Sequence, residues 1–477
     1  MADVTAANVG MVMERAASAA AIFSQLDQAQ VDRIVRAVYE AGFRERIRLA
    51  KMAREETGLG RWQDKVMKNV LATQFVYEGI RDLRTVGIIR EDERLGLVEI
   101  AQPIGPILAI VPVTNPTSTV LFKVLIAMKT RNPIIVKPHR RAERCSHETA
   151  RVCYEAALKA DAPEDCVQWL GGMSREDTQS LMSHEKMALI LATGGGSLVK
   201  AAYSSGTPAI GVGAGNVPVY IEGSADVPFA VDQILLSKTF DNGTVCASEQ
   251  AVVVEKAIAE RVISEFKAKR AHFLSKAEIG KLEAVAFDTR TRVMRMEVIG
   301  QEVAAIAAMA GITVPEETVL LIAPLEGVGE AYPLSHEILA PILAFYVADD
   351  FDHALRLSLD LNYNGGIGHT ASIFSNNEAR IREFSMLMNA GRVCVNLPSS
   401  QGAVGGLFNT LPTSFTLGCG TGGKNITTDN ITAAHLINIQ RITRRRVNER
   451  FERFDKRLYF DDGLDATAIE TVYNLNY

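Results

Sequence analysis

The sequence lacks paired cysteines, long apolar runs and any excess of positive charge. Its six cysteines are scattered, with no Cys-x-x-Cys pair and no metal-ligand spacing, which favours reduced thiols in a cytoplasmic protein over a zinc site or a disulfide scaffold. No apolar run approaches the roughly 20 residues that span a bilayer. There are 51 lysine and arginine residues against 56 aspartate and glutamate residues, and the net charge of −5 offers no basic face for nucleic acid. We therefore expect no metal, no nucleic-acid partner and no membrane partner.

What the sequence does contain is an alternation of apolar strands and helical segments. After about ninety mainly helical residues, strand patterns of buried type alternate with helical ones and lie at 107–111, 133–136, 167–170 and 188–192. A second series begins at AVVVE (251–255) and ends at RVCVN (392–396). Such alternation predicts parallel sheets covered on both faces. Because 477 residues are too many for one small core, we expect an α/β protein with two domains.

Two glycine clusters compete for a phosphate-binding role. The first, ATGGGS (192–197), follows an apolar strand and precedes a helical pattern. Free backbone N–H groups at such a helix start bind phosphate, so we expect a functional turn, with an ordinary βα turn as the alternative. The second, GVGAGN (211–216), is followed by a strand-like segment and lacks the helix that a dinucleotide fingerprint requires. We expect its glycines to permit close approach of backbones.

Three single residues stand where side chains commonly carry chemistry. Lys137 ends the strand IIVK and precedes Pro138, so its side chain faces either the crevice at the carboxyl edge of a parallel sheet or solvent. Asn115, between a strand and a helix in PVTNPTS, is a candidate for catalysis or an ordinary turn residue. Cys246 follows the turn-forming Asp-Asn-Gly of FDNGTVCASEQ. That position raises the question of whether it is a core thiol or a nucleophile.

In this order and spacing, these pieces resemble the aldehyde dehydrogenase superfamily over about residues 20 to 435. The Glu-x-x-x-Pro of that family matches Glu337 and Pro341 in HEILAP. The resemblance implies that Cys246 is the catalytic nucleophile and that Asn115 donates to the oxyanion. It also implies a set of coenzyme-binding residues, namely Lys137, Pro138, Arg140, Thr193, Gly194, Gly195, Gly196, Ser197 and Glu337.

The resemblance further implies an aldehyde dehydrogenase-like fold with two α/β domains and a small oligomerisation arm. Residues 1–238 would form a Rossmann-like coenzyme-binding domain that includes an arm strand near 91–103. Residues 239–430 would form the catalytic domain, and 431–477 a helical oligomerisation tail. In that tail, we interpret the basic run at 441–446 as a solvated helix face. A homo-oligomer, either a dimer or a tetramer, is expected.

One departure separates this chain from the hydrolytic members of the family. Those members carry a water-activating glutamate in a Glu-Leu-Gly-Gly segment, where this chain has Val212 in GVGAGN. The segments TNPTS, SSQGAVGG (399–406) and LGCG (417–420) resemble the CoA-acylating branch, including the aldehyde dehydrogenase half of bifunctional aldehyde–alcohol dehydrogenases. The resemblance implies that coenzyme A, and not water, releases the acyl group from Cys246. A hydrolytic enzyme and a non-enzymatic scaffold on this fold are the rival hypotheses.

Finer local features favour one coenzyme and one substrate. NAD-using relatives place a carboxylate shortly after Lys-Pro, whereas this chain has Arg140 and Arg141, which favours NADP over NAD because arginine pairs with a 2′-phosphate. The segments RVCVNLPSS and LGCGTGGKNITTDN most resemble the sulfoacetaldehyde dehydrogenases of the acylating branch. We therefore expect sulfoacetaldehyde, with Lys424 as a candidate sulfonate partner. Acetaldehyde and propanal remain open. Cys394, Cys419 and His369 are interpreted as structural residues.

Overall fold

The computed structural model describes residues 9–288 and 293–475, and it opens with a layer of helices. These are α1 (Val9–Phe23), α2 (Gln28–Arg44), α3 (Arg46–Thr57), α4 (Trp62–Val70) and α5 (Val76–Ile80), with a π-helical turn (Leu71–Phe75) joining the last two. Helix α2 begins at a capping box formed by Asp27 and Gln30, which satisfies N–H groups of its first turn. The helical start predicted from the sequence is confirmed.

A five-stranded parallel sheet forms the core of the first half, in the order β5-β4-β3-β6-β7. Its strands and helices alternate along the chain as β3 (Ile107–Val111), α6 (Pro116–Lys129), β4 (Ile134–Pro138), α7 (Glu143–Lys159), β5 (Val167–Trp169), α8 (Arg175–Met182), β6 (Leu189–Thr193), α9 (Gly196–Tyr203) and β7 (Ala209–Val212). Strand β3 is buried along its whole length because both faces of the sheet are covered. Its residues Ile107 and Ala109 pack toward α2, α6 and α7, whereas Leu108 and Ile110 pack toward α1, α8 and α9.

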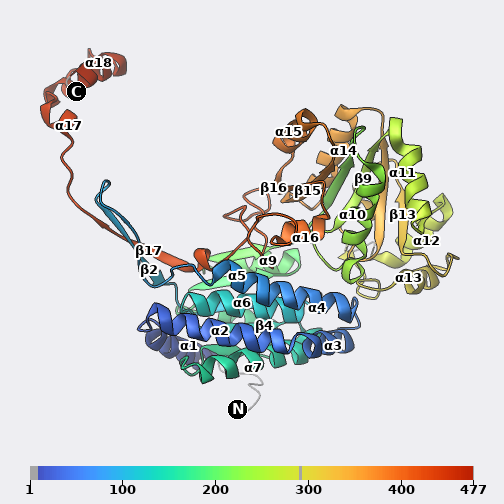
Figure 1. Ribbon diagram of the computed structural model, residues 1–477, viewed down its shortest axis with the longest axis horizontal. Coiled ribbons are helices and arrows are strands. Elements are labelled where there is room, and N and C mark those ends of the chain that lie inside the picture. The colour runs from blue at the N-terminus through green and yellow to red at the C-terminus, as the bar shows by residue number, and fades with distance from the viewer. Residues whose placement is uncertain (1–8, 289–292, 476–477) are drawn as a thin grey trace.

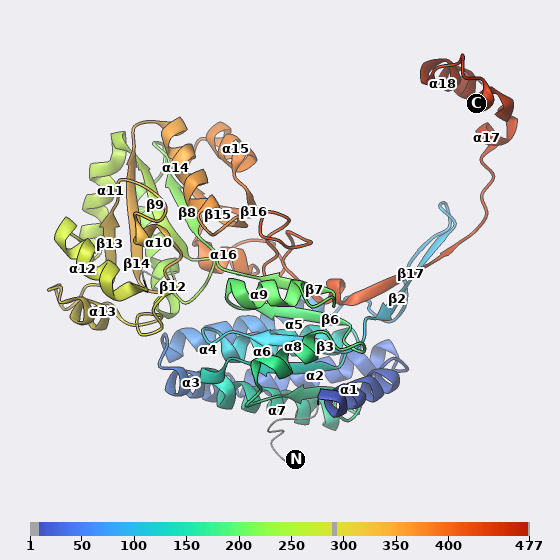
Figure 2. The same cartoon turned by 180° about the vertical axis from the view of Figure 1, so that it is seen from behind.

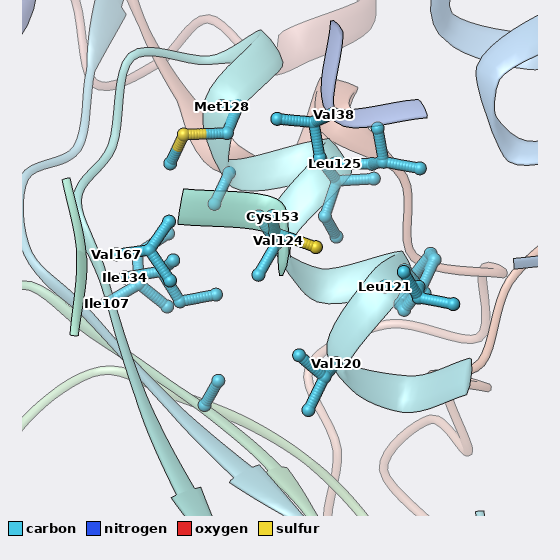
Figure 3. Close-up of a cluster of buried hydrophobic side chains, with 14 of the residues drawn as sticks. Val38, Ile107, Val120, Leu121, Val124, Leu125, Met128, Ile134, Cys153 and Val167 are labelled. Atoms are coloured by element: carbon cyan, nitrogen blue, oxygen red, sulfur yellow. The ribbon is translucent and has the colours of Figure 1, made fainter. Parts of the chain in front are cut away.

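Helix α6 lies in the middle of this core, and every one of its residues is buried. Figure 3 shows its side chains Val120, Val124 and Met128 gathered with those of neighbouring strands. The α6 segment follows directly on the loop that holds Asn115. A helix packed on all sides holds that loop in one position at the carboxyl edge of the sheet.

A seven-stranded parallel sheet forms the second lobe, in the order β10-β13-β14-β9-β8-β15-β16. Its elements are β8 (Val217–Ile221), α10 (Val227–Thr239), β9 (Glu249–Glu255), α11 (Lys256–Ala268), β10 (Ala271–Phe273), α12 (Lys276–Ala286), α13 (Val303–Ala310), β13 (Leu320–Pro324), β14 (Ile342–Ala348), α14 (Phe351–Tyr363), β15 (Gly368–Phe374), α15 (Glu378–Leu387), β16 (Ala390–Val395) and α16 (Ser399–Val404). A short hairpin of β11 (Phe287–Asp288) and β12 (Val293–Met294) lies outside the sheet. Helices α10 and α11 cover one face, and α14 and α15 cover the other (Figures 1 and 2).

The chain passes from the first sheet to the second earlier than the sequence boundary at 238 and 239. Strand β8 pairs with β9 and β15, so it belongs to the seven-stranded sheet although it precedes residue 238. The change of sheet therefore falls in GVGAGN, between β7 and β8. Sequence periodicity shows that a strand exists, but which sheet it joins depends on pairing with strands far along the chain.

An antiparallel arm of three strands, in the order β1-β2-β17, extends away from both lobes (Figures 1 and 2). It consists of β1 (Gly87–Asp92), β2 (Leu97–Pro103) and β17 (Ile437–Thr443), and α17 (Glu449–Arg453) and α18 (Ala466–Leu475) lie beyond it. The prediction of a helical face for the basic run at 441–446 is wrong, because the run begins on β17 and continues without helix. Its residues are exposed, as expected. None of the helices within 9–288 and 293–475 is long and apolar enough to cross a membrane.

Candidate active site

Cys246 lies on a tight turn between α10 and β9. Asp241 and Asn242 both adopt the left-handed backbone region, with φ of 51°, which short polar side chains tolerate better than others. Gly243 follows with φ of 74°, and a Cβ on it would lie 2.7 Å from the carbonyl oxygen of Ala340. From Asp241 to Gln250, Cys246 is the one residue that is not fully buried. The fold thus buries the turn and leaves Cys246 partly exposed.

The thiol of Cys246 is neutral in this state. Burial raises its pKa to about 12, and the carboxylate of Glu337 acts in the same direction, while the guanidinium of Arg392 opposes them. The other five cysteines are buried. Among them, Cys394 lies on β16 and Cys419 packs with Val212, as the structural interpretation expected. A nucleophilic role for Cys246 therefore needs a base or a charge change on ligand binding.

Asn115 contacts the turn that carries Cys246. Its side-chain Nδ2 donates to the carbonyl oxygen of Thr244 at 3.2 Å and to Thr114 Oγ1 at 3.1 Å. Although it occupies the N-cap position of α6, its side chain makes no capping hydrogen bond. The structure therefore places this amide beside the thiol-bearing turn, which a plain cap residue would not require.

The GVGAGN segment packs between Cys246 and Glu337. Gly215 N donates to Glu337 Oε1 at 2.8 Å, and a Cβ on Gly215 would lie 2.2 Å from the carbonyl oxygen of Cys246. The glycines thus permit close approach of backbones, as the sequence predicted. Val212 ends β7 and is 2% exposed, so an apolar side chain fills the position at which the resemblance would place the carboxylate of a hydrolytic enzyme. Burial raises the pKa of the partly buried Glu337 to about 7.

Apart from Glu337, which precedes β14 of the second lobe, the candidate coenzyme residues lie at one edge of the five-stranded sheet. Strands β3, β4 and β6 are parallel neighbours, so Asn115, Lys137 and the turn at 193–197 all follow carboxyl ends at that edge. Gly195 caps α9, and a Cβ on Gly195 or on Gly196 would meet open space. Thr193 Oγ1 is buried without a hydrogen-bond partner in the described chain. Open space, a helix start and an unpartnered hydroxyl fit a dinucleotide phosphate.

Lys137 and the residues after it differ in their exposure to solvent. Lys137 is partly buried, and burial together with nearby Arg140 lowers the pKa of its ammonium. Pro138 ends β4 and is buried, whereas Arg140 and Arg141 are exposed. The cation of Arg140 is therefore available to a ligand at this edge.

Comparison with known proteins decides the family. Residues 1–409 match the model of the aldehyde dehydrogenase family.

The chain belongs to the aldehyde dehydrogenase family.

Its relatives place this aldehyde dehydrogenase in the acylating branch. It is 45% identical over 457 residues to an aldehyde-alcohol dehydrogenase of Clostridium acetobutylicum, covering 95% of this chain and 53% of that protein. It is 37% identical over 434 residues to a sulfoacetaldehyde dehydrogenase (acylating) of Bilophila wadsworthia, covering 90% and 93% of the two chains. The crystal structure of an acetylating aldehyde dehydrogenase from Geobacillus thermoglucosidasius matches with a TM-score of 0.90 and 44% identity, covering 92% and 97%. The chain spans about half the length of the aldehyde-alcohol dehydrogenases it matches.

Two features of this aldehyde dehydrogenase site were missed by sequence reasoning. Lys65 and Lys68 on α4 are buried against the carboxylate of Asp241, at 2.9 and 2.5 Å. A pair of lysines three residues apart on a helix usually faces solvent, so no local pattern signals this contact. The only signal was the acidic residue in the Asp-Asn-Gly turn.

The second missed feature is a buried histidine and a buried arginine near the turn that carries Cys246. His369 was interpreted as structural, but a Cβ on Gly215 would lie 3.2 Å from its ring, and its Nε2 has no partner among the residues described. Arg392 donates to the carbonyl oxygens of His369, Gly418 and Thr428 at 2.6 to 2.9 Å. In the described ranges, no group of three metal-ligating side chains comes together.

Proposed function

We propose that this aldehyde dehydrogenase oxidises a small aldehyde with NAD(P)⁺ and coenzyme A to an acyl-CoA, through a thioester on Cys246. The observation that carries the proposal is the pairing of an accessible Cys246 with Val212. A reachable thiol can form the acyl intermediate, while the buried valine leaves no carboxylate in GVGAGN to activate water. The five-stranded lobe, up to Val212, would mainly serve coenzyme binding, and the seven-stranded lobe, from Val217 on, the acyl chemistry.

In the first half of the reaction, the sulfur of Cys246 attacks the aldehyde carbon and a C–S bond forms. The thiol proton needs an acceptor, and Glu337 is the carboxylate that acts on this thiol, with a pKa near working pH. The negative charge on the aldehyde oxygen would be stabilised by Asn115 Nδ2 and the backbone N–H of Cys246. To do so, Nδ2 exchanges its bond to the Thr244 carbonyl for one to the substrate.

The coenzyme would bind along Lys137, Pro138, Arg140 and the turn at 193–197, with Glu337 as a ribose ligand. Bound there, NAD(P)⁺ would supply the hydride acceptor, so that oxidation of the Cys246 adduct would leave a thioester on Cys246. Glu337 can serve both as the proton acceptor and as the ribose ligand. A carboxyl group with a pKa of about 7 is present in both protonation states near neutral pH, and either state can bind a hydroxyl group.

In the second half, the thiol of coenzyme A attacks the thioester and Cys246 leaves as the thiol. Burial lowers the pKa of His369 to about 3, so its imidazole is neutral, and its unpartnered Nε2 can accept a hydrogen bond from an incoming thiol. Water would compete poorly, because Val212 cannot deprotonate it and a thiolate is intrinsically the stronger nucleophile.

Acetaldehyde is the substrate that these findings favour over sulfoacetaldehyde. The chain shares 45% identity with an aldehyde-alcohol dehydrogenase and 44% with an acetylating enzyme, against 37% with the sulfoacetaldehyde enzyme. Two cationic side chains that could bind a sulfonate, those of Lys424 and Arg392, also give it little support. Lys424 is exposed, and the guanidinium of Arg392 is already bound to three carbonyl oxygens. Comparing kcat/KM for acetaldehyde, propanal and sulfoacetaldehyde would decide; a clear preference for sulfoacetaldehyde would contradict this choice.

For the coenzyme, the exposed Arg140 beside Lys137 supports a preference for NADP, since its guanidinium can pair with a 2′-phosphate.

For assembly, strand β17 has an exposed outer edge next to β2, which supports pairing of arms into a dimer or a tetramer. Light scattering of the intact chain and of a chain ending at residue 436 would test the assembly. If both chains form particles with the same number of subunits, the arm does not hold the oligomer together.

The proposed function is tested by leaving out coenzyme A. With a small aldehyde and NAD(P)⁺ alone, we expect at most about one equivalent of reduced coenzyme per active site, followed by a stall. Adding coenzyme A should restore steady turnover and yield a thioester. Sustained production of free carboxylic acid without coenzyme A, at a comparable rate, would show a hydrolytic enzyme. No reduced coenzyme with any aldehyde would favour the non-enzymatic scaffold.

A further inference from the structure

Helix α4 directs a buried ammonium group toward the Asn115 side chain. Lys68 is 3% exposed, and its Nζ donates to Asn115 Oδ1 at 2.6 Å. The same nitrogen donates to Asp241 Oδ2 at 2.5 Å and to Thr244 Oγ1 at 3.1 Å. One cation therefore joins Asn115 to two residues of the turn that carries Cys246.

We propose that Lys68 is a positioning residue: its ammonium group holds the Asn115 amide with Nδ2 toward the Cys246 turn and polarises that amide as an oxyanion donor. This inference rests on the part of the proposed function in which Asn115 stabilises the oxyanion. It does not depend on whether coenzyme A or water completes the reaction.

The orientation of the amide follows from the donors that a lysine offers. An ammonium group has three N–H donors and no acceptor, so it can bond only to the oxygen of a neighbouring amide. With Oδ1 held by Lys68, the Nδ2 of Asn115 must face the opposite side, where it donates to the Thr244 carbonyl two residues before Cys246. A flipped amide would present its oxygen to the oxyanion and repel it.

The charge of the cluster adds to this effect. Lys65 and Lys68 both pair with the carboxylate of Asp241, which is 0% exposed, and the carboxylate of Asp64 is a second anion near Lys68. The Lys68 ammonium group is the cation in direct contact with the Asn115 amide oxygen, and at this buried position water screens its charge little. A hydrogen bond from a cation to the amide oxygen draws electrons from the nitrogen and strengthens its N–H groups as donors.

Lys65 supplies a matched control on the same helix. It is 2% exposed, and its Nζ contacts Asp241 Oδ2 at 2.9 Å and the carbonyl oxygen of Thr114 at 3.1 Å, so neither bond goes to the Asn115 side chain. Replacing either lysine by methionine removes one buried cation of similar volume and leaves Asp241 paired with the other. The two variants therefore differ mainly in whether Asn115 keeps its ammonium partner.

The experiment is a double-mutant cycle on the single-turnover reduction of coenzyme by aldehyde, without coenzyme A. We expect Lys68→Met to lower this rate by about 10- to 100-fold and Lys65→Met by less than about threefold, while Asn115→Ala costs about 10²- to 10³-fold. Because Lys68 acts through Asn115, the double variant Lys68→Met/Asn115→Ala should be no slower than Asn115→Ala, to within about twofold. Equal losses for the two lysines, or losses that multiply in the double variant, would overturn the proposal.

The pH dependence of the rate distinguishes an effect of the Lys68 charge from a purely structural effect of its side chain. Burial lowers the pKa of Lys68 to about 8 against the opposing effect of Asp241, and Lys65 and Asp64 are the other charged groups near it. Those groups are present in both proteins, so the ratio of wild-type to Lys68→Met rates should fall as pH rises through about 8. A ratio independent of pH would refute the polarising charge.

Folding and function are checked separately. Each variant is compared only if its melting temperature and its titre of reactive Cys246 match the wild type. If Lys68→Met does not fold, Lys68→Gln takes its place in the same double-mutant cycle. The same rate comparisons then support or overturn the proposal. If the wild type itself reduces no coenzyme, the proposed function fails before any variant is compared.

Discussion

Gly215 lies directly against the carbonyl group of Cys246, because a Cβ on this glycine would lie 2.2 Å from that oxygen. The nucleophile is therefore held by a backbone contact with a residue 31 positions earlier in the chain. We expect Gly215→Ala to move the Cys246 peptide, destabilise the protein by about 1–3 kcal/mol and slow alkylation of the thiol by iodoacetamide. Gly213→Ala is the control, since a Cβ there meets nothing within 4 Å. Equal melting temperatures and alkylation rates for the two variants would contradict the contact.

Cys246→Ser should abolish aldehyde oxidation and the acyl intermediate while leaving coenzyme binding nearly intact. A hydroxyl group is a far weaker nucleophile than a thiolate, and the side chains differ little in size. Cys419→Ser is the matched control, because Cys419 lies near the site and its thiol donates to the carbonyl oxygen of Leu417 at 3.3 Å, which a serine hydroxyl can also do. Steady-state rates and mass spectrometry of the trapped acyl-enzyme give the answer. More than a few per cent of activity in Cys246→Ser would reject the nucleophile.

The partly buried carboxyl group of Glu337 should make stability depend on pH. Burial raises its pKa from 4.5 to about 7, so between these values the unfolded chain loses a proton that the folded chain keeps. Stability is then lost as pH rises through this window. Glu337→Gln removes the penalty and keeps an acceptor for Gly215 N, so without coenzyme it should stabilise by roughly 1–2 kcal/mol at pH 8 and little at pH 4.5.

The measurement is the melting temperature of wild type and variant across that range. Exposed Glu326 serves as control through Glu326→Gln, for which no pH-dependent difference is expected. A Glu337→Gln effect of the same size at both pH values would show that the carboxyl group does not titrate in this window.

Arg140 and Arg141 test the coenzyme preference. Changing them to glutamate and alanine should shift the ratio of kcat/KM for NADP to that for NAD by at least about tenfold toward NAD. A charge-assisted bond to a 2′-phosphate contributes roughly 1.5–3 kcal/mol. Arg144→Ala, an exposed arginine at the start of α7, serves as a control for lost surface charge. An unchanged ratio in the double variant would place both arginines in solvent.

Much of the fold and of the site could be predicted from the sequence, because the signals are local. Strands such as 107–111 are continuous apolar runs between turn residues, and the glycines at 194–196 stand between a strand and a helix. Cys246 follows a turn whose residues tolerate a left-handed backbone. Each of these features depends on neighbours within a few residues, so the order of amino acids alone determined them.

Tertiary structure decided the rest. Lys65 and Lys68 meet Asp241 across 176 and 173 residues, and Gly215 meets Glu337 across 122. The place of β8 in the second sheet and the strand at 437–443 likewise depend on partners far along the chain. Such contacts are set by how layers pack and by which strands pair, and a buried charge is tolerated only where that packing supplies its partner. Sequence periodicity does not predict contacts between residues that lie far apart in the chain. The contact of Lys68 with Asn115 was therefore found only in the three-dimensional structure.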